Sequence, residues 1–576
     1  MRAATLPLDA AAPRRRVLLA LALALPLLAA AAPRDLWAPD EPRSGLIART
    51  MLETGDWLVP RINGAVYAEK APLVHWTMAA SGAVLGMTPF AARLPCALLA
   101  SLAILLTYRL ARRWWGDADL AATAALLFAT TGLMLWNASR AALDLPMIAC
   151  SLVALEAGTV VVARGSIPAA LLAGLALGLG LLAKGPHALY LPAGALVGGC
   201  WAAGRWKRLV DPRWLLSLLV AAGVVAAWLL PALAAAGDEI AYNSTSTFRE
   251  RLLGQLTSRV SGESEPHEAP WWYLLPLLLA FGLPWTPVWA AAVPRALRPR
   301  RVDVADRFGL GAALGGLLVP LVLLSIPASK REMYLLPLLP CAAMLAAWMV
   351  HRVAESRASS HAVRVVAVVL LAVALGAFAT PILVRADALP RGNLDRDLLA
   401  TLAQGAVPFA LGAVGALCAA GAGSAWLLRR RPVGAVRAAA VTTAAAGLVA
   451  FLGVLPAFDP WKSFADAVAE GERVAPGAPL ASAGFADASV LWAFRRDRLL
   501  QLGNRHVPAA ASMLAHDAPP LLLLSKAKHW WEEIDRATPA HRAALSRARV
   551  VWRRAVGGTR YVLVTNALPP GEPGDR

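Results

Sequence analysis

The chain has 576 residues, of which 58% are hydrophobic and only 16% are charged, with a formal net charge of +19. Soluble domains carry roughly 25% charged residues, so this composition excludes an ordinary soluble protein. A large positive charge is also typical of nucleic-acid-binding proteins, but here the basic clusters lie between long apolar runs, where they orient helices and contact anionic lipid headgroups. We therefore expect a polytopic α-helical membrane protein, in contact with membrane lipids and with no nucleic-acid partner.

Thirteen apolar segments are long enough to cross the roughly 30 Å hydrocarbon core as helices. The first follows Arg14-Arg15-Arg16 and resembles a signal peptide, but the spans after it favour a retained helix. Composition leaves open whether residues 70–106 form one helix or a short surface helix followed by a span. We expect spans at residues 15–33, 78–106, 119–136, 143–163, 166–183, 186–203, 213–236, 271–291, 308–327, 333–351, 364–384, 402–427 and 436–456.

Basic residues mark one side of the membrane. With the N-terminus in the cytoplasm, every cytoplasmic loop carries Arg or Lys, as the positive-inside rule requires. These loops are Tyr108–Asp117, Arg164, Arg205–Arg213, Arg295–Arg307, His351–Arg364 and Arg429–Arg437. We therefore expect a transmembrane domain over 1–456, with outside loops 34–72 and 237–270, and an outside C-terminal domain over 457–576.

The C-terminal segment differs in character from the rest of the chain. It contains Pro476-Gly477, short apolar runs at Leu521–Leu524 and Tyr561–Thr565, and a helical pattern at Trp530–Arg536. Strands mixed with helices predict a small α/β domain. Because it has no phosphate-binding glycine loop and no nucleophile elbow, a lid or docking role is favoured.

Unusual polar residues gather in the outside loops. In loop 34–72, the apolar spacing from Pro42 predicts an amphipathic helix in the membrane interface. Asp40 lies near its start, where the helix dipole favours a carboxylate, and Arg43 lies three residues further on. A capping Asp with a solvated salt bridge also explains this pair taken alone.

Further polar residues lie in or beside the other outside loops, and ionisable groups beside apolar spans are costly unless they face a cavity, a partner or a substrate. Convergence of cations and carboxylates on one side predicts a pocket for a phosphate and a polar acceptor. The residues are Asn137, Arg140, Asp144, Lys184, His187, Arg249, Arg251, Arg259, His267, Lys330, Arg331 and Tyr334.

The stretches LWAPDEPR, GDWLVP and YAEKAPLVHW resemble the first periplasmic loop of the ArnT-like glycosyltransferases, bacterial relatives of the protein O-mannosyltransferases with the GT-C fold. The similarity continues at SRAALDLP, LLAKGP, WWYLLPLLLAFGLPW and SIPASKREMYLLPLLP, so it covers most of the chain from about 34 to 345, and it extends to a C-terminal periplasmic domain. It implies a bacterial inner-membrane enzyme that transfers a sugar from polyprenyl (undecaprenyl) phosphate to a periplasmic acceptor. The narrowest version transfers 4-amino-4-deoxy-L-arabinose to lipid A.

The resemblance also implies roles for individual residues. Asp40, which opens the motif Asp40-Glu41-Pro42-Arg43, would accept the proton of an acceptor hydroxyl, with Glu41 and Asp144 also at the catalytic centre. Attack opposite the phosphate would invert the anomeric centre. Because the lipid phosphate leaves as an anion, cations must receive its charge. The implied substrate-binding residues are Arg43, Tyr67, Glu69, Lys70, Lys184, Lys330, Arg331 and Tyr334.

A metal site is a further implication of the resemblance. Glu69 and His267 would be ligands of a divalent metal such as Zn²⁺, although zinc usually takes four ligands. Asp117-Ala118-Asp119 has the form of the DxD motif of metal-dependent glycosyltransferases, but the expected topology places it on the cytoplasmic side beside a basic loop.

Two other classes stay open. A transporter or lipid flippase predicts charges near the middle of the spans and internal repeats with interrupted helices, whereas this sequence has no clear repeat and its ionisable residues gather at one interface. A structural scaffold for envelope assembly would leave the loop charges replaceable. Loss of activity in Asp40→Asn with normal membrane insertion would count against both.

Overall fold

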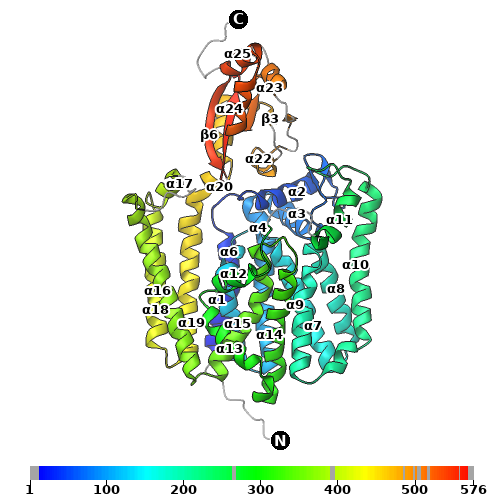
Figure 1. The fold of residues 1–576 in the computed structure, drawn as a ribbon, viewed down its shortest axis with the longest axis vertical. Helices are drawn as coiled ribbons and strands as arrows, with labels where there is room; N and C mark the ends of the chain where they lie inside the picture. The colour runs from blue at the N-terminus through cyan, green and yellow to red at the C-terminus, as the bar shows by residue number, and fades with distance from the viewer. Residues whose placement is uncertain are drawn as a thin grey trace.

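A bundle of long helices carries an α/β domain on one end (Figure 1). The computed structural model describes residues 12–261, 268–388, 396–483, 487–496, 500–502, 507–514, 519–556 and 558–567. Within these ranges nine helices are long and apolar enough to cross a membrane, or ten if a bent pair counts as one span, which confirms the polytopic membrane class. The nine are α4 (Pro89–Trp115), α7 (Asp144–Arg164), α8 (Ile167–Lys184), α10 (Arg213–Ala236), α14 (Val304–Ser325), η3 with α15 (Glu332–Leu338 and Leu339–Arg352), α16 (Arg357–Arg385), α18 (Val407–Leu427) and the segment Pro432–Lys462 that begins with α19 (Pro432–Val449).

The other predicted spans are also helical but are shorter, broken or more charged. Segment 119–136 forms the bent pair, α5 (Ala118–Ala129) and α6 (Gly132–Ala138), at 66°. Helix α1 (Ala12–Ala30) includes three arginines, and α9 (His187–Ala202) has 16 residues. Segment 271–291 is divided into α12 (Leu274–Phe281) and α13 (Thr286–Ala296). The number of crossings therefore stays a prediction.

The predicted span 78–106 is wrong in its boundaries. The structure has a short helix α3 (Leu73–Leu85) followed by α4, which begins at Pro89 and runs to Trp115. Gly86 adopts a positive φ of 74°, a conformation that favours glycine, and the Thr88 side chain accepts a hydrogen bond from the Ala91 amide. Proline at the first helical position completes this start signal.

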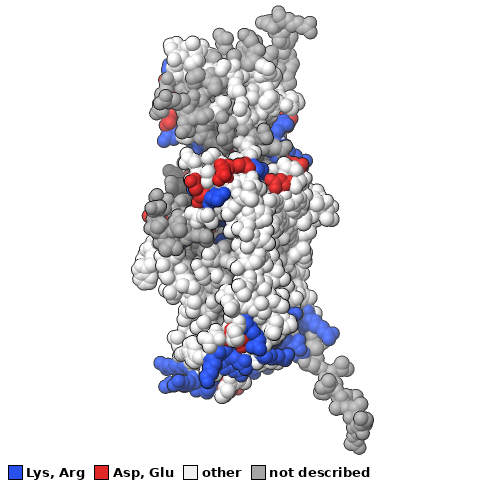
Figure 2. Space-filling model, turned by 90° about the vertical axis from the view of Figure 1, so that its right-hand side faces the viewer, with Lys and Arg blue, Asp and Glu red and all other residues white. Residues whose placement is uncertain are grey.

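Charge is distributed as the loop analysis predicted. Lys and Arg gather at the end of the bundle away from the C-terminal domain, and the bundle face between the two ends shows few charges (Figure 2). At the basic end, Asp117 caps α5, and Asp119 pairs with Arg15 at 3.3 Å and Arg437 at 3.1 Å. In the DxD-like sequence, Asp117 is thus a helix cap, and Asp119 forms two ion pairs that connect α1 and α19 to α5.

Helices α9 and α14 approach each other backbone to backbone. Gly194 and Gly198 on α9 face Gly311 and Gly315 on α14, a pair of small-residue motifs of the type that permits close packing in membranes. A Cβ atom added at Gly198 would lie 2.3 Å from the carbonyl oxygen of Gly311. Because that neighbour is backbone, the contact cannot be relieved by moving a side chain.

Gly198→Leu is therefore expected to destabilise the bundle by about 1–3 kcal/mol or more. The measurement is thermal unfolding of the detergent-purified protein, with Gly223→Leu on α10 as the control, since nothing lies within 4 Å of a Cβ added there. Equal unfolding midpoints for Gly198→Leu and the wild type would contradict the close approach of α9 and α14.

The C-terminal domain is built on a five-stranded sheet. The strand order is β4-β3-β5-β7-β6, parallel across β4, β3 and β5 and antiparallel across β5, β7 and β6. The predicted strands and helix are confirmed as β5, β7 and α24. Its elements are α21 (Ala465–Val474), β3 (Leu480–Ala483), α22 (Ala488–Ala493), β4 (Leu500–Leu502), α23 (Val507–Met513), β5 (Leu522–Lys526), α24 (Ala527–Arg536), α25 (Pro539–Arg547), β6 (Arg549–Val556) and β7 (Thr559–Thr565).

Between the bundle and this domain lies a layer of loops and short elements (Figure 1). It contains α2 (Asp40–Thr54), the hairpin of β1 (Arg61–Ile62) and β2 (Ala65–Val66), α3 and α11 (Phe248–Ser261). The helix predicted from Pro42 is confirmed as α2, and Asp40 is its first residue. This layer and the helix ends beneath it form the candidate site.

Candidate active site

A polar cavity of about 120 Å³ lies where α2 meets the end of α8, the turn before α7 and the segment before η3. Segments far apart in the sequence therefore supply its walls. Nine of the twelve predicted site residues line it: Asp40, Arg43, Tyr67, Glu69, Lys70, Asp144, Lys184, Arg331 and Tyr334.

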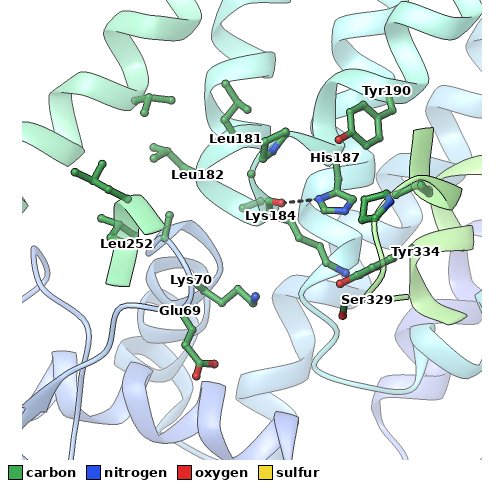
Figure 3. Close-up of a pocket in the computed structure, with 18 of the residues that line it drawn as sticks. Glu69, Lys70, Leu181, Leu182, Lys184, His187, Tyr190, Leu252, Ser329 and Tyr334 are labelled. Carbon is green, nitrogen blue, oxygen red and sulfur yellow. Dashed lines mark hydrogen bonds between the residues drawn. The ribbon is translucent and has the colours of Figure 1, made fainter. Parts of the chain in front are cut away.

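A larger, mainly apolar cavity of about 300 Å³ adjoins the polar one. Its apolar walls come from α8, α10, α11 and α14, for example Leu182, Trp228 and Leu324. The two cavities share four lining residues, Glu69, Lys70, Lys184 and Tyr334, all of which are labelled in Figure 3. A molecule with an apolar chain and an anionic head fits this pair of cavities, since the lysines lie where they meet.

Asp40 is held by two cations. Arg331 Nη2 donates to Asp40 Oδ2 at 3.2 Å, and Arg43 Nη2 lies 3.5 Å from Oδ1. Burial alone would raise the pKa of Asp40, but the positive charges of Arg331 and Arg43 outweigh burial and hold the pKa below its ordinary value. Asp40 is thus a carboxylate at neutral pH.

Asp144 and Lys184 form a buried ion pair in the lining of the same cavity. Asp144 begins α7, its side chain is 3% exposed, and it accepts a hydrogen bond from Lys184 Nζ at the end of α8. Lys184 Nζ also lies 4.9 Å from the ring centroid of Tyr334, a cation–π contact. The Tyr334 ring in turn packs against His187, with ring centroids 5.0 Å apart (Figure 3).

Glu69 lines both cavities and links α2, α11 and the segment that follows β2. It pairs with Arg43 on α2 at 3.4 Å and with Arg251 on α11 at 3.8 Å, and it accepts a hydrogen bond from the Tyr67 hydroxyl. Burial raises the pKa of Tyr67, so this phenol stays protonated and remains a donor.

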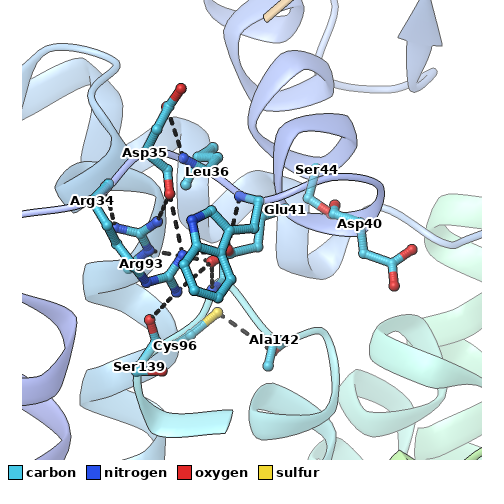
Figure 4. Close-up of polar contacts among 12 residues, drawn as sticks. Arg34, Asp35, Leu36, Asp40, Glu41, Ser44, Arg93, Cys96, Ser139 and Ala142 are labelled. Atoms are coloured by element: carbon cyan, nitrogen blue, oxygen red, sulfur yellow. Dashed lines mark hydrogen bonds and ion pairs between the residues drawn. The ribbon is translucent and has the colours of Figure 1, made fainter. Parts of the chain in front are cut away.

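Glu41 does not face the cavity. Its carboxylate is 1% exposed and turns into a cluster in which it accepts hydrogen bonds from Arg34 at 2.8 Å, Arg93 at 3.2 Å, and the amides of Trp37 and Ala141 (Figure 4). Burial opposes ionisation, but the two arginines outweigh it and lower the pKa of Glu41. The structure therefore does not place Glu41 in the cavity, where it was expected among the reacting groups.

Lys330 is also turned away. Its Nζ is buried and donates to the carbonyl oxygens of Ala269, at 2.8 Å, and Pro327. It lines neither cavity, so the structure does not place it where it was expected to bind the phosphate. Its contacts fasten the turn that precedes Arg331.

Arg140 was predicted to lie near the pocket, but the resemblance gave it no individual role. It lines the polar cavity, and its Nε is buried without a hydrogen-bond partner among the described residues. Its guanidinium carbon lies 5.2 Å from the Trp136 ring centroid. Its presence in the stretch SRAALDLP, four residues before Asp144, was the signal that could have identified it.

The metal prediction falls partly outside the described residues, because His267 is not among them. In the part of the chain that the structure describes, no group of three or more His, Cys, Asp or Glu could hold a metal ion. Glu69, the other predicted ligand, is already paired with two arginines. The metal site therefore stays a prediction.

The helical bundle, helix α2 and the C-terminal α/β domain together have the architecture of the GT-C membrane glycosyltransferases. The structure matches the crystal structure of ArnT from Cupriavidus metallidurans bound to undecaprenyl phosphate with a TM-score of 0.76 and 21% identity, covering 98% of this chain and 100% of that one. The apo structure of that protein matches with the same TM-score and 22% identity. The GT-C fold is thereby shown.

The sequence comparisons support the same resemblance. Residues 69–230 match the family described as dolichyl-phosphate-mannose-protein mannosyltransferase. The undecaprenyl phosphate-α-4-amino-4-deoxy-L-arabinose arabinosyl transferase of Pseudomonas aeruginosa is 34% identical over 343 residues, which are 58% of this chain and 59% of the relative. The protein of the same name from Edwardsiella ictaluri is 32% identical over 61% of this chain and 62% of its own length. The predicted likeness to the ArnT-like glycosyltransferases is confirmed, over roughly three-fifths of these relatives' length.

Proposed function

We propose that this protein is an inner-membrane glycosyltransferase that moves a sugar from a polyprenyl-phosphate carrier to an acceptor at the outer face of the membrane. One observation carries the proposal: a polar cavity containing Asp40 and several cations meets an apolar cavity between membrane helices at Lys184 and Tyr334. The names of the relatives, which are undecaprenyl-phosphate-sugar transferases, support the same class.

The apolar chain and the phosphate of the carrier fit different parts of the two cavities. Its apolar chain enters the larger cavity, and its phosphate lies beside Lys184 and Lys70, which line both. Arg331 and Arg140 line only the polar cavity, where they would face the phosphate or the acceptor. Guanidinium and ammonium groups together suit an anion whose charge grows as it leaves.

Transfer forms a bond from the acceptor oxygen to the anomeric carbon and breaks the bond from that carbon to the phosphate oxygen. A hydroxyl acceptor passes its proton to Asp40, and the bonding pair leaves with the phosphate. An acceptor that is already an anion has no proton to give, and Asp40 then acts by stabilising the positive charge that develops on the sugar ring. Attack from the face opposite the phosphate inverts the anomeric centre.

The basic end of the bundle supports a cytoplasmic assignment for that end, since positive loops stay inside (Figure 2). The two cavities and the C-terminal domain then lie at the periplasmic side. In its narrowest form the proposal has 4-amino-4-deoxy-L-arabinose as the sugar and lipid A as the acceptor, as the names of the relatives suggest for the sugar.

The test supplies the purified protein in nanodiscs with a panel of undecaprenyl-phosphate sugars and envelope acceptors, including lipid A, and identifies products by mass spectrometry. Sugar transfer by the wild type establishes the class and names both substrates. Movement of the donor across proteoliposomes without transfer would overturn the proposal in favour of a transporter or flippase.

Val225→Trp tests where the carrier binds. Val225 lines the apolar cavity from α10, and a tryptophan there takes up space that the carrier chain needs. We expect affinity for undecaprenyl phosphate to fall about tenfold, or about 1.4 kcal/mol, measured by microscale thermophoresis. The control is Val322→Trp on α14, whose side chain is largely exposed and lies outside both cavities. Unchanged affinity in Val225→Trp would contradict this binding mode.

A further inference from the structure

Helix α2 lies between the polar cavity and the C-terminal domain. Asp40 and Arg43, in its first turn, line the cavity, whereas Gly45 and Arg49 meet helix α22 of the C-terminal domain. Figure 1 shows α22 directly above α2. The helix that carries the proposed catalytic carboxylate therefore faces the cavity with one part and contacts the C-terminal domain with another.

Arg49 makes the polar part of this contact. It is buried, and its guanidinium donates to the carbonyl oxygens of Leu491 at 3.2 Å, Arg496 at 2.9 Å and Trp492 at 3.5 Å. Hydrogen bonds from a charged donor are roughly twice as strong as neutral ones. One side chain of α2 thus binds three carbonyl oxygens, two in α22 and one three residues after its end.

Trp492 makes the apolar part. The side chain is buried, and a ring carbon lies 3.0 Å from the position that a Cβ atom on Gly45 would occupy, so α2 and the indole touch closely at this glycine. The ring centroid lies 5.8 Å from the Arg49 guanidinium carbon, and Trp492 Nε1 donates to Asp35 Oδ1 at 3.4 Å.

The segment that precedes α2 is held by residues at the same domain boundary. Asp459 accepts hydrogen bonds from Trp37 Nε1 at 2.7 Å and from the Asp35 amide at 2.9 Å. The Ala38 amide donates to the carbonyl oxygen of Lys462 at 3.0 Å. Residues on both sides of Asp40 therefore depend on the end of the last span, where Asp459 and Lys462 lie, and on the C-terminal domain.

We propose that the C-terminal domain positions the reaction centre, with Arg49 and Trp492 as positioning residues that hold α2 so that Asp40 and Arg43 face the polar cavity. This role rests on the proposed transferase function. It is not a catalytic role, because neither residue lines the polar cavity or the apolar cavity beside it.

The test uses full-length Trp492→Ala and Arg49→Gln in nanodiscs. Because a displacement of about 1 Å can reduce a rate about a hundredfold, we expect kcat to fall between about tenfold and a hundredfold. Affinity for undecaprenyl phosphate is expected to stay within about twofold, since α8, α10 and α14 form its site. Trp492→Phe, which keeps a ring against Gly45, is expected to recover most of the activity. Trp531→Ala, on the exposed face of α24, is the control.

Hydrogen exchange provides a readout that is independent of activity. Amides of residues 40–54 are expected to exchange faster in Trp492→Ala, while those of residues 187–202 in α9 stay protected. Unchanged exchange in α2 together with unchanged kcat would overturn the proposal, as would an equal loss of kcat and carrier affinity with a lowered unfolding midpoint. If the wild type transfers no sugar, the proposed function fails, and exchange in α2 still decides whether the domain holds this helix.

Discussion

Asp40→Asn is expected to reduce sugar transfer by at least about a hundredfold, because general acid–base groups contribute about 10²–10⁴-fold. Asparagine has nearly the same shape, but it can neither take a proton from the acceptor nor balance positive charge on the sugar. The carrier site lies mainly on other elements, so affinity for undecaprenyl phosphate is expected to remain. The measurement is single-turnover transfer at saturating donor, with products counted by mass spectrometry.

Asp238→Asn supplies the matched control, since it is the same chemical change at a side chain that is 96% exposed in loop 237–270. The pH profile adds a second check. Because Arg331 and Arg43 lower the pKa of Asp40, the carboxylate is retained as the pH falls, and the acid limb of kcat/KM is expected below the ordinary carboxyl range. Transfer at the wild-type rate by Asp40→Asn would remove Asp40 from the mechanism.

The sequence was sufficient to predict the helices and part of the candidate site. Apolar runs and basic loops depend on composition over many residues, so single side chains do not disturb them. The interfacial helix could be predicted because its apolar spacing is local, and Asp40 with Arg43 follows from that helix. Asp144 and Lys184 could be placed together because both stand at helix ends that the expected topology puts on one side of the membrane.

Side-chain direction could not be predicted. Glu41 follows Asp40 and carries the same charge, but one helical residue turns it about 100° away from the cavity. There the Glu41 carboxylate pairs with Arg93, which lies 52 positions further along the chain. No local sequence pattern predicts such a contact. Lys330 and Arg331 differ in the same way, because only Arg331 reaches Asp40, while Lys330 binds the carbonyl oxygens of Ala269 and Pro327.

The prediction of where α4 begins failed for a different reason. Residues 78–106 are mainly apolar and contain a single charged residue, Arg93, so hydropathy alone did not show the break. The signals were present as Gly86, Thr88 and Pro89, and they act through backbone conformation and capping. The structure resolves the alternative left open by composition in favour of a surface helix followed by a span.

The second large effect is expected from the buried cluster around Glu41. Glu41→Ala leaves Arg34 and Arg93 buried without their carboxylate, and removal of one partner from a buried ion pair costs about 3–5 kcal/mol. The cluster also joins α2 to the turn before α7, through the Ala141 amide and through the hydrogen bond from Arg34 to the Ser139 carbonyl. We therefore expect a large loss in the free energy of unfolding, measured by denaturation in detergent.

Glu53→Ala on the same helix is the matched control. Glu53 is 46% exposed and pairs with Arg49 at 3.6 Å, so its loss is expected to change stability by less than about 1 kcal/mol. Glu41→Gln separates positioning from catalysis, because it keeps the shape and part of the hydrogen bonding. If Glu41 only positions its neighbours, those Glu41→Gln molecules that fold are expected to keep kcat within about tenfold of the wild type. If kcat of Glu41→Gln fell as far as that of Asp40→Asn, in protein with an unchanged unfolding midpoint, Glu41 would be one of the reacting groups.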